Sequence, residues 1–386
     1  MIKYIKYSLF PFLLLLLIYL SAIGGASLNY FITIFSLFVI VGDLLLSDDI
    51  TIYQNANRKI LNFILFSHLP LLFLYFLCTI YMLGNSNPVY FESILNKLFN
   101  LDISLNRQNT SSIHFIGYFI TAGLFFAGAG INIGHELTHR KNDKISMFFG
   151  NWLLAFSWDC AFALEHVQGH HKNVCTSSDP ATSKRGENIY KFLFLATIKE
   201  QIDAWRIERT YLKRNKIPLL SAKNRMIRGY IRSAVITVIS FYIGGLTGMI
   251  AYLIIAISSK FVLEAINYIE HHGLVRVPGT KVRPEHSWNS NAMISGVLLF
   301  NLTRHSAHHE KANLEFWQLP IYKNAPMLPA GYLSMIYLAL LLPIVYHWVM
   351  SKHLLNWDKK YATPDERELA SKQNKSSGIF KLVQQV

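Results

Sequence analysis

An apolar segment that leads directly into a pair of histidines occupies residues 113–140 and reads IHFIGYFITAGLFFAGAGINIGHELTHR. Its apolar part, residues 113–133, is long enough to cross the roughly 30 Å hydrocarbon core of a bilayer as a helix. The imidazoles of His135 and His139 are four positions apart and therefore lie on one face of a helix. The segment predicts a transmembrane helix that ends on a histidine site at one membrane surface.

The composition of the whole chain agrees with a membrane protein. Of its 386 residues, 52% are hydrophobic and only 16% are charged, whereas soluble proteins carry about 25% charged residues. Lysine and arginine number 37 against 23 aspartate and glutamate, which leaves a net charge of +14. So much apolar material excludes a disordered chain and leaves a membrane enzyme, channel or transporter. Cys78, Cys160 and Cys175 form no CxxC pair, so any metal must be held by other side chains.

Six transmembrane helices are predicted from the apolar runs. Four of them lie in residues 1–134, where the first two form a hairpin that turns at residues 24–25. Basic residues beside these spans place the start of the chain and the end of the fourth span in the cytoplasm. Residues 233–266 form a second transmembrane hairpin if the glycines at 244–248 turn the chain, and two crossings return it to the cytoplasm. The apolar runs are residues 9–23, 28–46, 60–83, 113–133 and 234–266.

The remaining segments are predicted to lie outside the bilayer core. Residues 135–232 and 267–332 form two cytoplasmic regions that contain most of the histidines. Residues 333–350 are apolar but interrupted by Pro343, and we interpret them as a re-entrant or interfacial helix. Residues 351–386 are predicted to be a polar, partly disordered tail. The predicted fold class is an all-α integral membrane protein with a histidine-rich region on the cytoplasmic side.

Ten histidines fall in four short clusters, each at the predicted cytoplasmic end of a span. The first, residues 135–139, spells HExxH, which alone would suggest a zinc hydrolase with Glu136 as general base. The second, residues 165–171, again places two imidazoles four positions apart. The third is residues 270–272, and the last, residues 304–309, places three imidazoles on one helical face. The clustered residues are His135, His139, His166, His170, His171, His271, His272, His305, His308 and His309.

So many clustered imidazoles are about twice what one metal ion with three or four ligands uses, which implies two metals. Imidazole suits zinc, copper, iron and nickel, and spacing does not choose among them. Two redox-active ions beside a lipid-filled cavity suggest iron and dioxygen. Glu136, Glu165 and Glu270 each stand next to a clustered histidine, where a carboxylate can hydrogen-bond to the ring and fix its orientation. We assign a similar supporting role to His286, which lies in a loop rich in hydrogen-bonding groups.

These motifs resemble those of the membrane-bound alkane 1-monooxygenase (alkane omega-hydroxylase) family, within the fatty-acid desaturase and hydroxylase superfamily. The matching stretches, in the family's order, are residues 132–140 (NIGHELTHR), 165–171 (EHVQGHH), 179–183 (DPATS), 267–271 (NYIEH), 286–291 (HSWNSN) and 302–309 (LTRHSAHH). Two positions depart from the family's pattern: His272 stands where the family usually has tyrosine, and Ala307 where it usually has aspartate.

The resemblance implies a di-iron centre that faces the cytoplasm from a bacterial inner membrane. Its nine ligands would be His135, His139, His166, His170, His171, His271, His305, His308 and His309, with His272 as a possible further ligand. It also implies terminal hydroxylation by O₂ of a linear alkane, drawn from the membrane lipid, to a 1-alcohol. Electrons would come from a rubredoxin, itself reduced by an NAD(P)H-dependent reductase. No nucleic-acid partner is expected.

A narrow channel between the spans would present only the end of an alkane to the metals. Phe125 and Phe126 are candidates to line it, although helix packing or lipid contact is the more frequent role of such residues. A basic stretch, residues 206–216, offers a surface for an acidic carrier, for solvent or for lipid headgroups.

Four other functions remain open at this point. A xylene-type methyl hydroxylase or a fatty-acid desaturase or hydroxylase would share the iron site, and the stretch 267–271 argues against the desaturase. An HExxH intramembrane zinc metalloprotease would leave three histidine clusters unexplained. A metal transporter would be expected to carry its ligands at mid-membrane along a path.

Overall fold

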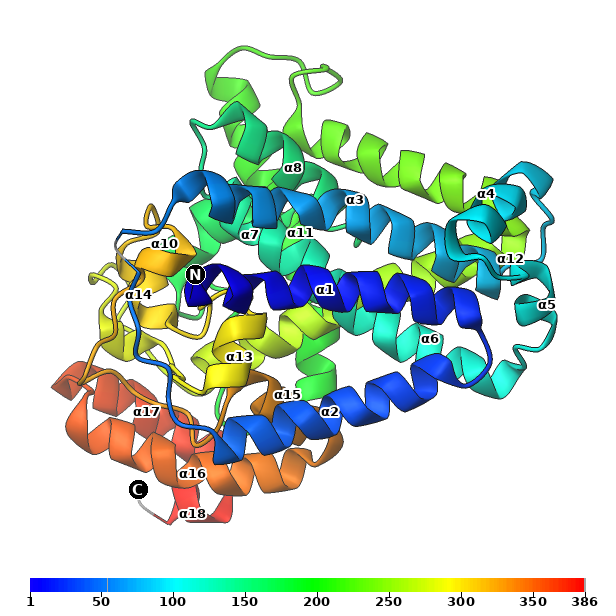
Figure 1. Ribbon diagram of the computed structural model, residues 1–386. Helices are drawn as coiled ribbons and strands as arrows, with labels where there is room; N and C mark the ends of the chain where they lie inside the picture. Colours follow the sequence, from blue (N-terminus) through cyan, green and yellow to red (C-terminus); the bar gives the residue numbers. More distant parts are fainter. Residues whose placement is uncertain (54, 385–386) are drawn as a thin grey trace. The chain divides into compact units, whose positions relative to one another are not determined.

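The computed structural model describes residues 1–53 and 55–384 and is built of helices (Figure 1). No β-strand occurs among these residues, and one isolated bridge joins Asn289 to Met327. The predicted all-α class is confirmed. The helices are α1 (Ile2–Ile23), α2 (Ser27–Leu45), α3 (Arg58–Leu83), α4 (Val89–Phe99), α5 (Ile103–Gln108), α6 (Ser112–Phe125), η1 (Phe126–Asn132), α7 (Ile133–Thr138), α8 (Lys144–Ala155), α9 (Phe162–Glu165), η2 (His166–His170), α10 (His171–Asn173), α11 (Ile189–Arg214), α12 (Arg225–His271), η3 (Pro284–His286), α13 (Met293–Leu298), α14 (His305–Glu310), η4 (Phe316–Gln318), α15 (Tyr332–Leu341), α16 (Pro343–Lys360), α17 (Pro364–Ser376) and α18 (Phe380–Val383).

Five helical segments among the described residues are long and apolar enough to cross a membrane. They are α1, α2, α3, the continuous segment Ser112–Thr138 and α12. The last contains 47 residues, about 70 Å at 1.5 Å per residue, which is more than twice a bilayer core. Its Gly245 has φ 64° and ψ −163°, a conformation that glycine alone adopts readily. The helix is therefore interrupted where the sequence predicts a hairpin turn.

The contacts divide the chain into two compact units. The first contains Met1–Phe38, Asn55–Cys160 and Ile217–Val262. The second contains the segment that begins at Val39, Ala161–Lys216, and the chain from Leu263 onward. The HExxH pair therefore belongs to the first unit, and the other histidine clusters belong to the second.

Small residues bring the helices of the first unit together. Helix α1 packs along α3 (Figure 1). A Cβ added to Gly134 in α7 would lie 3.1 Å from the backbone oxygen of Gly150 in α8, so these helices touch through their backbones. Helix α8 has 12 residues, too few to span a bilayer. Lys260, inside α12, is buried and paired at 3.0 Å with Asp159, which offsets its charge.

The chain after residue 332 differs from the sequence prediction. The predicted single helix 333–350 is two helices, α15 and α16, because Pro343 takes the first position of α16, where a missing N–H costs nothing. The segment predicted to be a polar, partly disordered tail contains helices, in the last part of α16 and in α17 and α18. Helix α17 begins with a capping box, in which Thr363 and Glu366 satisfy each other's backbone N–H groups.

Candidate metal centre

Four histidine rings converge in the second unit, and we call them the histidine quartet. His170 comes from η2, His271 ends α12, and His305 and His309 lie on α14. One ring nitrogen of each lies within 4.8 Å of the others. Nε2 of His305 is 3.1 Å from Nε2 of His271 and 3.0 Å from that of His309. All four side chains are withdrawn from solvent.

Three further rings of the second unit face one another and form the histidine trio. Nε2 of His171 lies 3.1 Å from Nε2 of His166 and 3.1 Å from Nε2 of His308. The His166 and His308 nitrogens are 3.5 Å apart. The quartet and the trio together contain seven of the nine histidines that the resemblance implies as ligands.

A π-helical turn divides the histidines of the second cluster between the two groups: His166 and His171 belong to the trio, and His170 belongs to the quartet. The sequence spacing predicts that His166 and His170 share a face, because an α-helix aligns positions i and i+4. In η2 the helix is wider, and its hydrogen bonds run from i to i+5. His166 therefore meets His171, five positions on, while His170 joins the quartet. The rings of His166 and His170 are still close, with centroids 5.1 Å apart, but the two residues belong to different histidine groups.

The histidines of helix α14 are also divided between the quartet and the trio. The sequence places His305, His308 and His309 on one face, and the structure confirms the i,i+4 pair His305 and His309. His308 instead faces His171 of the trio at 3.1 Å. The three residues therefore lie at the boundary between trio and quartet.

The HExxH segment forms its own pair in the first unit. Nε2 of His135 lies 2.9 Å from Nε2 of His139, as the i,i+4 spacing on α7 predicts. Glu136, the general base of the hydrolase alternative, forms an ion pair with Arg140 at 2.8 Å. Arg140 also donates to Asn62 at 2.7 Å. Glu136 thus holds the side chain of Arg140, which follows α7.

The facing nitrogens fit metal ions better than mutual hydrogen bonds. Only one proton can lie between two facing nitrogens, so three or four converging nitrogens cannot all be satisfied by one another. Nε2 of His170 is buried and has no hydrogen-bond partner among the described residues. Ligands at about 2.1 Å from one ion, at tetrahedral or octahedral angles, lie roughly 2.9–3.4 Å apart. Four of the Nε2–Nε2 distances, at 2.9–3.1 Å, fall in that range.

Two of the quartet rings are oriented through their other nitrogen. Nδ1 of His170 bonds to both carboxylate oxygens of Asp179, at 2.9 and 3.1 Å. Nδ1–H of His271 donates to the backbone oxygen of His286 at 2.9 Å. These bonds direct the Nε2 lone pairs of both rings into the quartet.

The pKa values of two quartet histidines shift in opposite directions. Burial alone lowers the pKa of His170, but the charge and hydrogen bond of Asp179 outweigh it and raise the pKa above 6.5. Burial raises the pKa of Asp179, and the bonds from His170 and Thr182 reverse this and lower it. Burial and the neighbouring imidazoles hold the pKa of His309 well below its ordinary value. His309 is therefore neutral at pH 7, as a ligand must be.

The residues predicted to support the ligands contact the histidine groups in different ways. Oε2 of Glu270 lies 3.3 Å from Nε2 of His305. Glu165 is buried beneath η2, where a Cβ at Gly169 would meet its Oε1. The backbone oxygen of His286 accepts the hydrogen bond from Nδ1 of His271. Asp179 was missed as an orienting carboxylate, although it stands in the DPATS stretch that carries the resemblance.

His272 lies outside both histidine groups. Its Nδ1 is 3.0 Å from Oγ of Ser183, and its ring packs 4.8 Å from the ring of Tyr268. His68 is buried in α3, with Nδ1 2.8 Å from the backbone oxygen of Ile64. Neither ring belongs to the quartet or the trio.

The two channel candidates are buried in aromatic contacts of the first unit. The ring of Phe125 lies 5.3 Å from that of Phe10 and 5.2 Å from that of Phe35. The ring of Phe126 lies 6.0 Å from that of Tyr75 and 5.9 Å from that of Phe156. Both are placed to shape an apolar interior.

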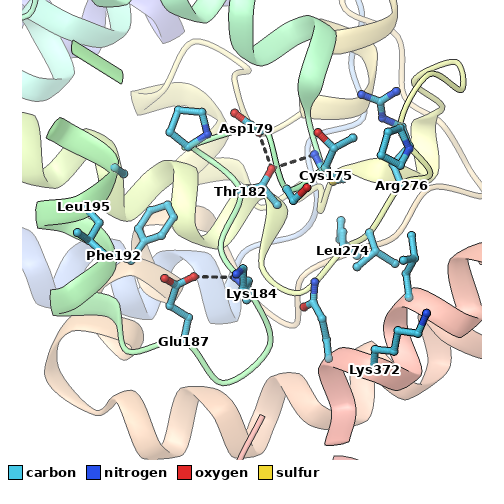
Figure 2. Close-up of a pocket in the computed structure, with 18 of the residues that line it drawn as sticks. Cys175, Asp179, Thr182, Lys184, Glu187, Phe192, Leu195, Leu274, Arg276 and Lys372 are labelled. Atoms are coloured by element: carbon cyan, nitrogen blue, oxygen red, sulfur yellow. Dashed lines mark hydrogen bonds between the residues drawn. The ribbon is translucent and has the colours of Figure 1, made fainter. Parts of the chain in front are cut away.

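A cavity of about 420 Å³ opens beside the quartet in the second unit (Figure 2). Its wall includes Cys175, Asp179 and Thr182, with Arg276 and Lys372 among its cations. Oγ1 of Thr182 donates to Asp179 at 2.5 Å and accepts from the backbone N–H of Cys175 at 2.9 Å. Asp179 therefore separates this cavity from His170.

The chain matches a sequence model of the fatty acid desaturase family over residues 111–339. That span includes the HExxH pair, the trio and the quartet. The chain therefore belongs to the fatty acid desaturase family, and it is an integral membrane protein.

Within the family, the chain is similar to alkane 1-monooxygenases. It is 38% identical to alkane 1-monooxygenase 2 of Alcanivorax borkumensis over 234 residues. The aligned segment covers 59% of this chain and 61% of the relative. It is 34% identical over 265 residues to the alkane 1-monooxygenase of Acinetobacter baylyi, covering 67% and 64%. The xylene/toluene monooxygenase hydroxylase component of Pseudomonas putida is 30% identical over 253 residues, covering 64% and 66%. The predicted resemblance is confirmed, and the chain spans less than two thirds of the length of these relatives.

Proposed function

We propose that this protein is a membrane hydroxylase that uses O₂ to convert linear alkanes to 1-alcohols. The observation that carries the proposal is the set of converging imidazole nitrogens, in a chain similar to alkane 1-monooxygenases. In balanced form, an alkane, O₂, two electrons and two protons yield a 1-alcohol and water. Breaking a terminal C–H bond needs a strong oxidant, which acid–base chemistry by side chains does not supply.

We assign the nine histidines to two iron ions. The quartet is proposed to hold one iron and the trio to contribute to the other, and the family resemblance adds His135 and His139 to the proposed ligands. When bound, the irons supply the reduction of O₂ and the oxidation of the C–H bond. The protein's own residues hold the lone pairs in place, through Asp179 and the His286 carbonyl, and keep the site dry.

Terminal selectivity is proposed to come from confinement. An apolar channel, with Phe125 and Phe126 as candidate lining residues, would admit an alkane from the lipid and present only its end. A secondary C–H bond is weaker than a primary one, so an open site would favour mid-chain alcohols. Confinement is what reverses that preference.

Electrons are proposed to come from a rubredoxin that is reduced by an NAD(P)H-dependent reductase. This sequence contains no CxxC pair, so the carrier would be a separate domain or protein. Exposed cations on the second half of α11, such as Arg206 and Arg209, offer a complementary surface for an acidic carrier. Turnover should then fall as salt rises to hundreds of millimolar, because the screening length is about 10 Å at 0.1 M. We also propose a bacterial inner-membrane location with the metal centre on the cytoplasmic side.

A xylene-type methyl hydroxylase is the second candidate, because a xylene/toluene monooxygenase component is among the relatives. Cells that express the protein should be fed alkanes of graded length, fatty acids and xylene, and their products separated by gas chromatography. The proposal expects the 1-alcohol from a linear alkane, with one oxygen atom from ¹⁸O₂. A methylbenzyl alcohol as the main product would favour the second candidate, and a predominant 2- or 3-alcohol would contradict end-on binding.

The metal assignment has its own test. The purified protein should contain two irons per chain, and His135→Ala, His170→Ala and His308→Ala should each lower bound iron and abolish hydroxylation. His68→Ala is a matched control, because that buried histidine contacts a backbone carbonyl of its own helix. Full activity in any of the three ligand variants would contradict the di-iron assignment, and one zinc per chain would favour the hydrolase alternative.

A further inference from the structure

The short turn η3 carries the carbonyl that orients one quartet histidine. His271 donates its Nδ1–H to the backbone oxygen of His286, the last residue of the turn, at 2.9 Å. Nε2 of His271 then bears the lone pair, and this is the atom that faces His305 at 3.1 Å. The position of the turn therefore decides where that lone pair points.

The backbone of the turn is held from outside. Nε1 of Trp357, on α16, donates to the backbone oxygen of Glu285 at 2.7 Å. Oγ of Ser306, on α14, donates to the backbone oxygen of Pro284 at 2.5 Å. The turn is thus attached both to the histidine helix α14 and to the C-terminal part of the chain.

The side chain of His286 adds the third attachment. Its Nδ1 accepts from the backbone N–H of Arg283 at 3.1 Å, so its Nε2 carries the proton. That Nε2–H donates to Oε1 of Glu366, on α17, at 2.8 Å. The His286 ring is fully buried and the Glu366 carboxylate is 3% exposed. A buried hydrogen bond to a carboxylate is among the stronger contacts that a side chain can make.

A separate contact anchors the same two helices near the end of α12. Arg185 donates to both carboxylate oxygens of Asp358 in α16, at 2.6 and 2.7 Å. It also donates to Oδ1 of Asn374 in α17 at 2.7 Å and to the backbone oxygen of Gly273 at 2.8 Å. Helices α16 and α17 are therefore fixed against the segment that carries His271.

We propose that Glu366 and Trp357 are positioning residues for the ligand His271, acting through η3. The inference rests on the proposed metal centre, because it requires that His271 binds metal. The family match ends at residue 339, before both residues. The C-terminal helices are thus assigned a role in the metal site, although they lie outside the matched segment.

The test uses the full chain in detergent micelles, loaded with Fe(II), and measures the rate at which iron is lost to a chelator. Glu366→Ala should lose iron roughly tenfold faster than the unmodified protein, the lower end of effects seen for groups that orient a ligating histidine. Trp357→Phe should shift the rate in the same direction by a smaller factor. Glu366→Gln should be intermediate, since its amide oxygen can still accept from His286. Glu368→Ala, on the same helix with its side chain 71% exposed, should match the unmodified protein.

A further variant separates positioning from general stabilisation. Arg283→Ala removes the 2.7 Å ion pair with Glu366 but leaves the His286 bond. It should lower the unfolding temperature without speeding iron loss. Equal iron loss in Arg283→Ala and Glu366→Ala would overturn the inference in favour of a purely structural role. Iron retention at the unmodified rate in both Glu366→Ala and Trp357→Phe would overturn it as well, whereas an unmodified protein that binds no iron would contradict the proposed function itself.

Discussion

Nδ1 of His170 lies 2.9 Å from Oδ2 of Asp179, and both side chains are buried. The same carboxylate accepts from the hydroxyl of Thr182 and from the backbone N–H of Ala181. Asp179 is therefore held rigidly in turn, and the orientation of His170 does not depend on solvent. The contact gives the quartet a carboxylate–histidine arrangement of the kind that raises ligand basicity in metal sites.

Replacing this carboxylate should weaken the quartet. Asp179→Asn keeps the shape but removes the negative charge beside His170, and we expect iron affinity to fall roughly tenfold or more. Iron titration of the purified protein measures the effect. Asp203→Asn is the control, because Asp203 pairs with the exposed Arg206 on the surface of α11. Unchanged iron affinity in Asp179→Asn would argue against His170 as a ligand.

The π-helical turn should be sensitive to a single methyl group. A Cβ at Gly169 would collide with Oε1 of the buried Glu165, so Gly169→Ala should displace η2 and reduce bound iron. Gly296→Ala is the matched control, since its Cβ would approach no atom closer than 3.7 Å. Metal analysis and circular dichroism of both variants distinguish loss of the site from loss of the fold. Normal iron content in Gly169→Ala would show that the turn tolerates the change.

His272 should be dispensable for metal binding. Its ring contacts Ser183 and Tyr268 and lies outside the quartet, so His272→Tyr should retain both iron and hydroxylation. Iron content and product yield are measured together. Loss of one iron in this variant would show that His272 is a ligand after all.

The stability that Glu366 contributes should depend on pH. Burial raises its pKa, but the hydrogen bonds from His286 and from the backbone N–H of Thr363, together with the charge of Arg283, lower it to about 2 from 4.5. Its ionised form therefore stabilises the folded protein above about pH 4.5, and this contribution is lost as the pH falls towards 2. The difference in unfolding temperature between the unmodified protein and Glu366→Gln should be constant near neutrality and shrink in acid. A difference that grows below pH 4.5 would contradict the ion pair.

The channel proposal predicts a change in chain-length preference. Phe126→Ala removes ring contacts with Tyr75 and Phe156 and should widen the apolar interior. We expect turnover of longer alkanes to rise relative to shorter ones, while the product remains the 1-alcohol. Competition between alkanes of two lengths gives the ratio directly. Phe148→Ala, an exposed aromatic on α8, should leave the ratio unchanged.

The helical class, most of the spans and the clustered histidines could be predicted, because length, hydropathy and i,i+4 spacing are local properties. The rings of His135 and His139 face each other at 2.9 Å, as their i,i+4 spacing predicts. The break at Gly245 also fell within the predicted turn. The sequence predicts only a polar, partly disordered tail and not its helices, because the partners that hold them, Arg185 and His286, lie about 80 to more than 170 positions away.

The sequence by itself determined which residues are the candidate metal ligands, since histidines in such short clusters are visible without any fold. Only the tertiary structure decided how they are grouped. The spacing does not predict the π-helical turn, which lets His171 face His166 at 3.1 Å while His170 joins the quartet. The groups that orient the histidines, Asp179 and the His286 carbonyl, could not be predicted from the sequence either. A backbone oxygen is present in every residue, and these contacts form only when separate segments pack together.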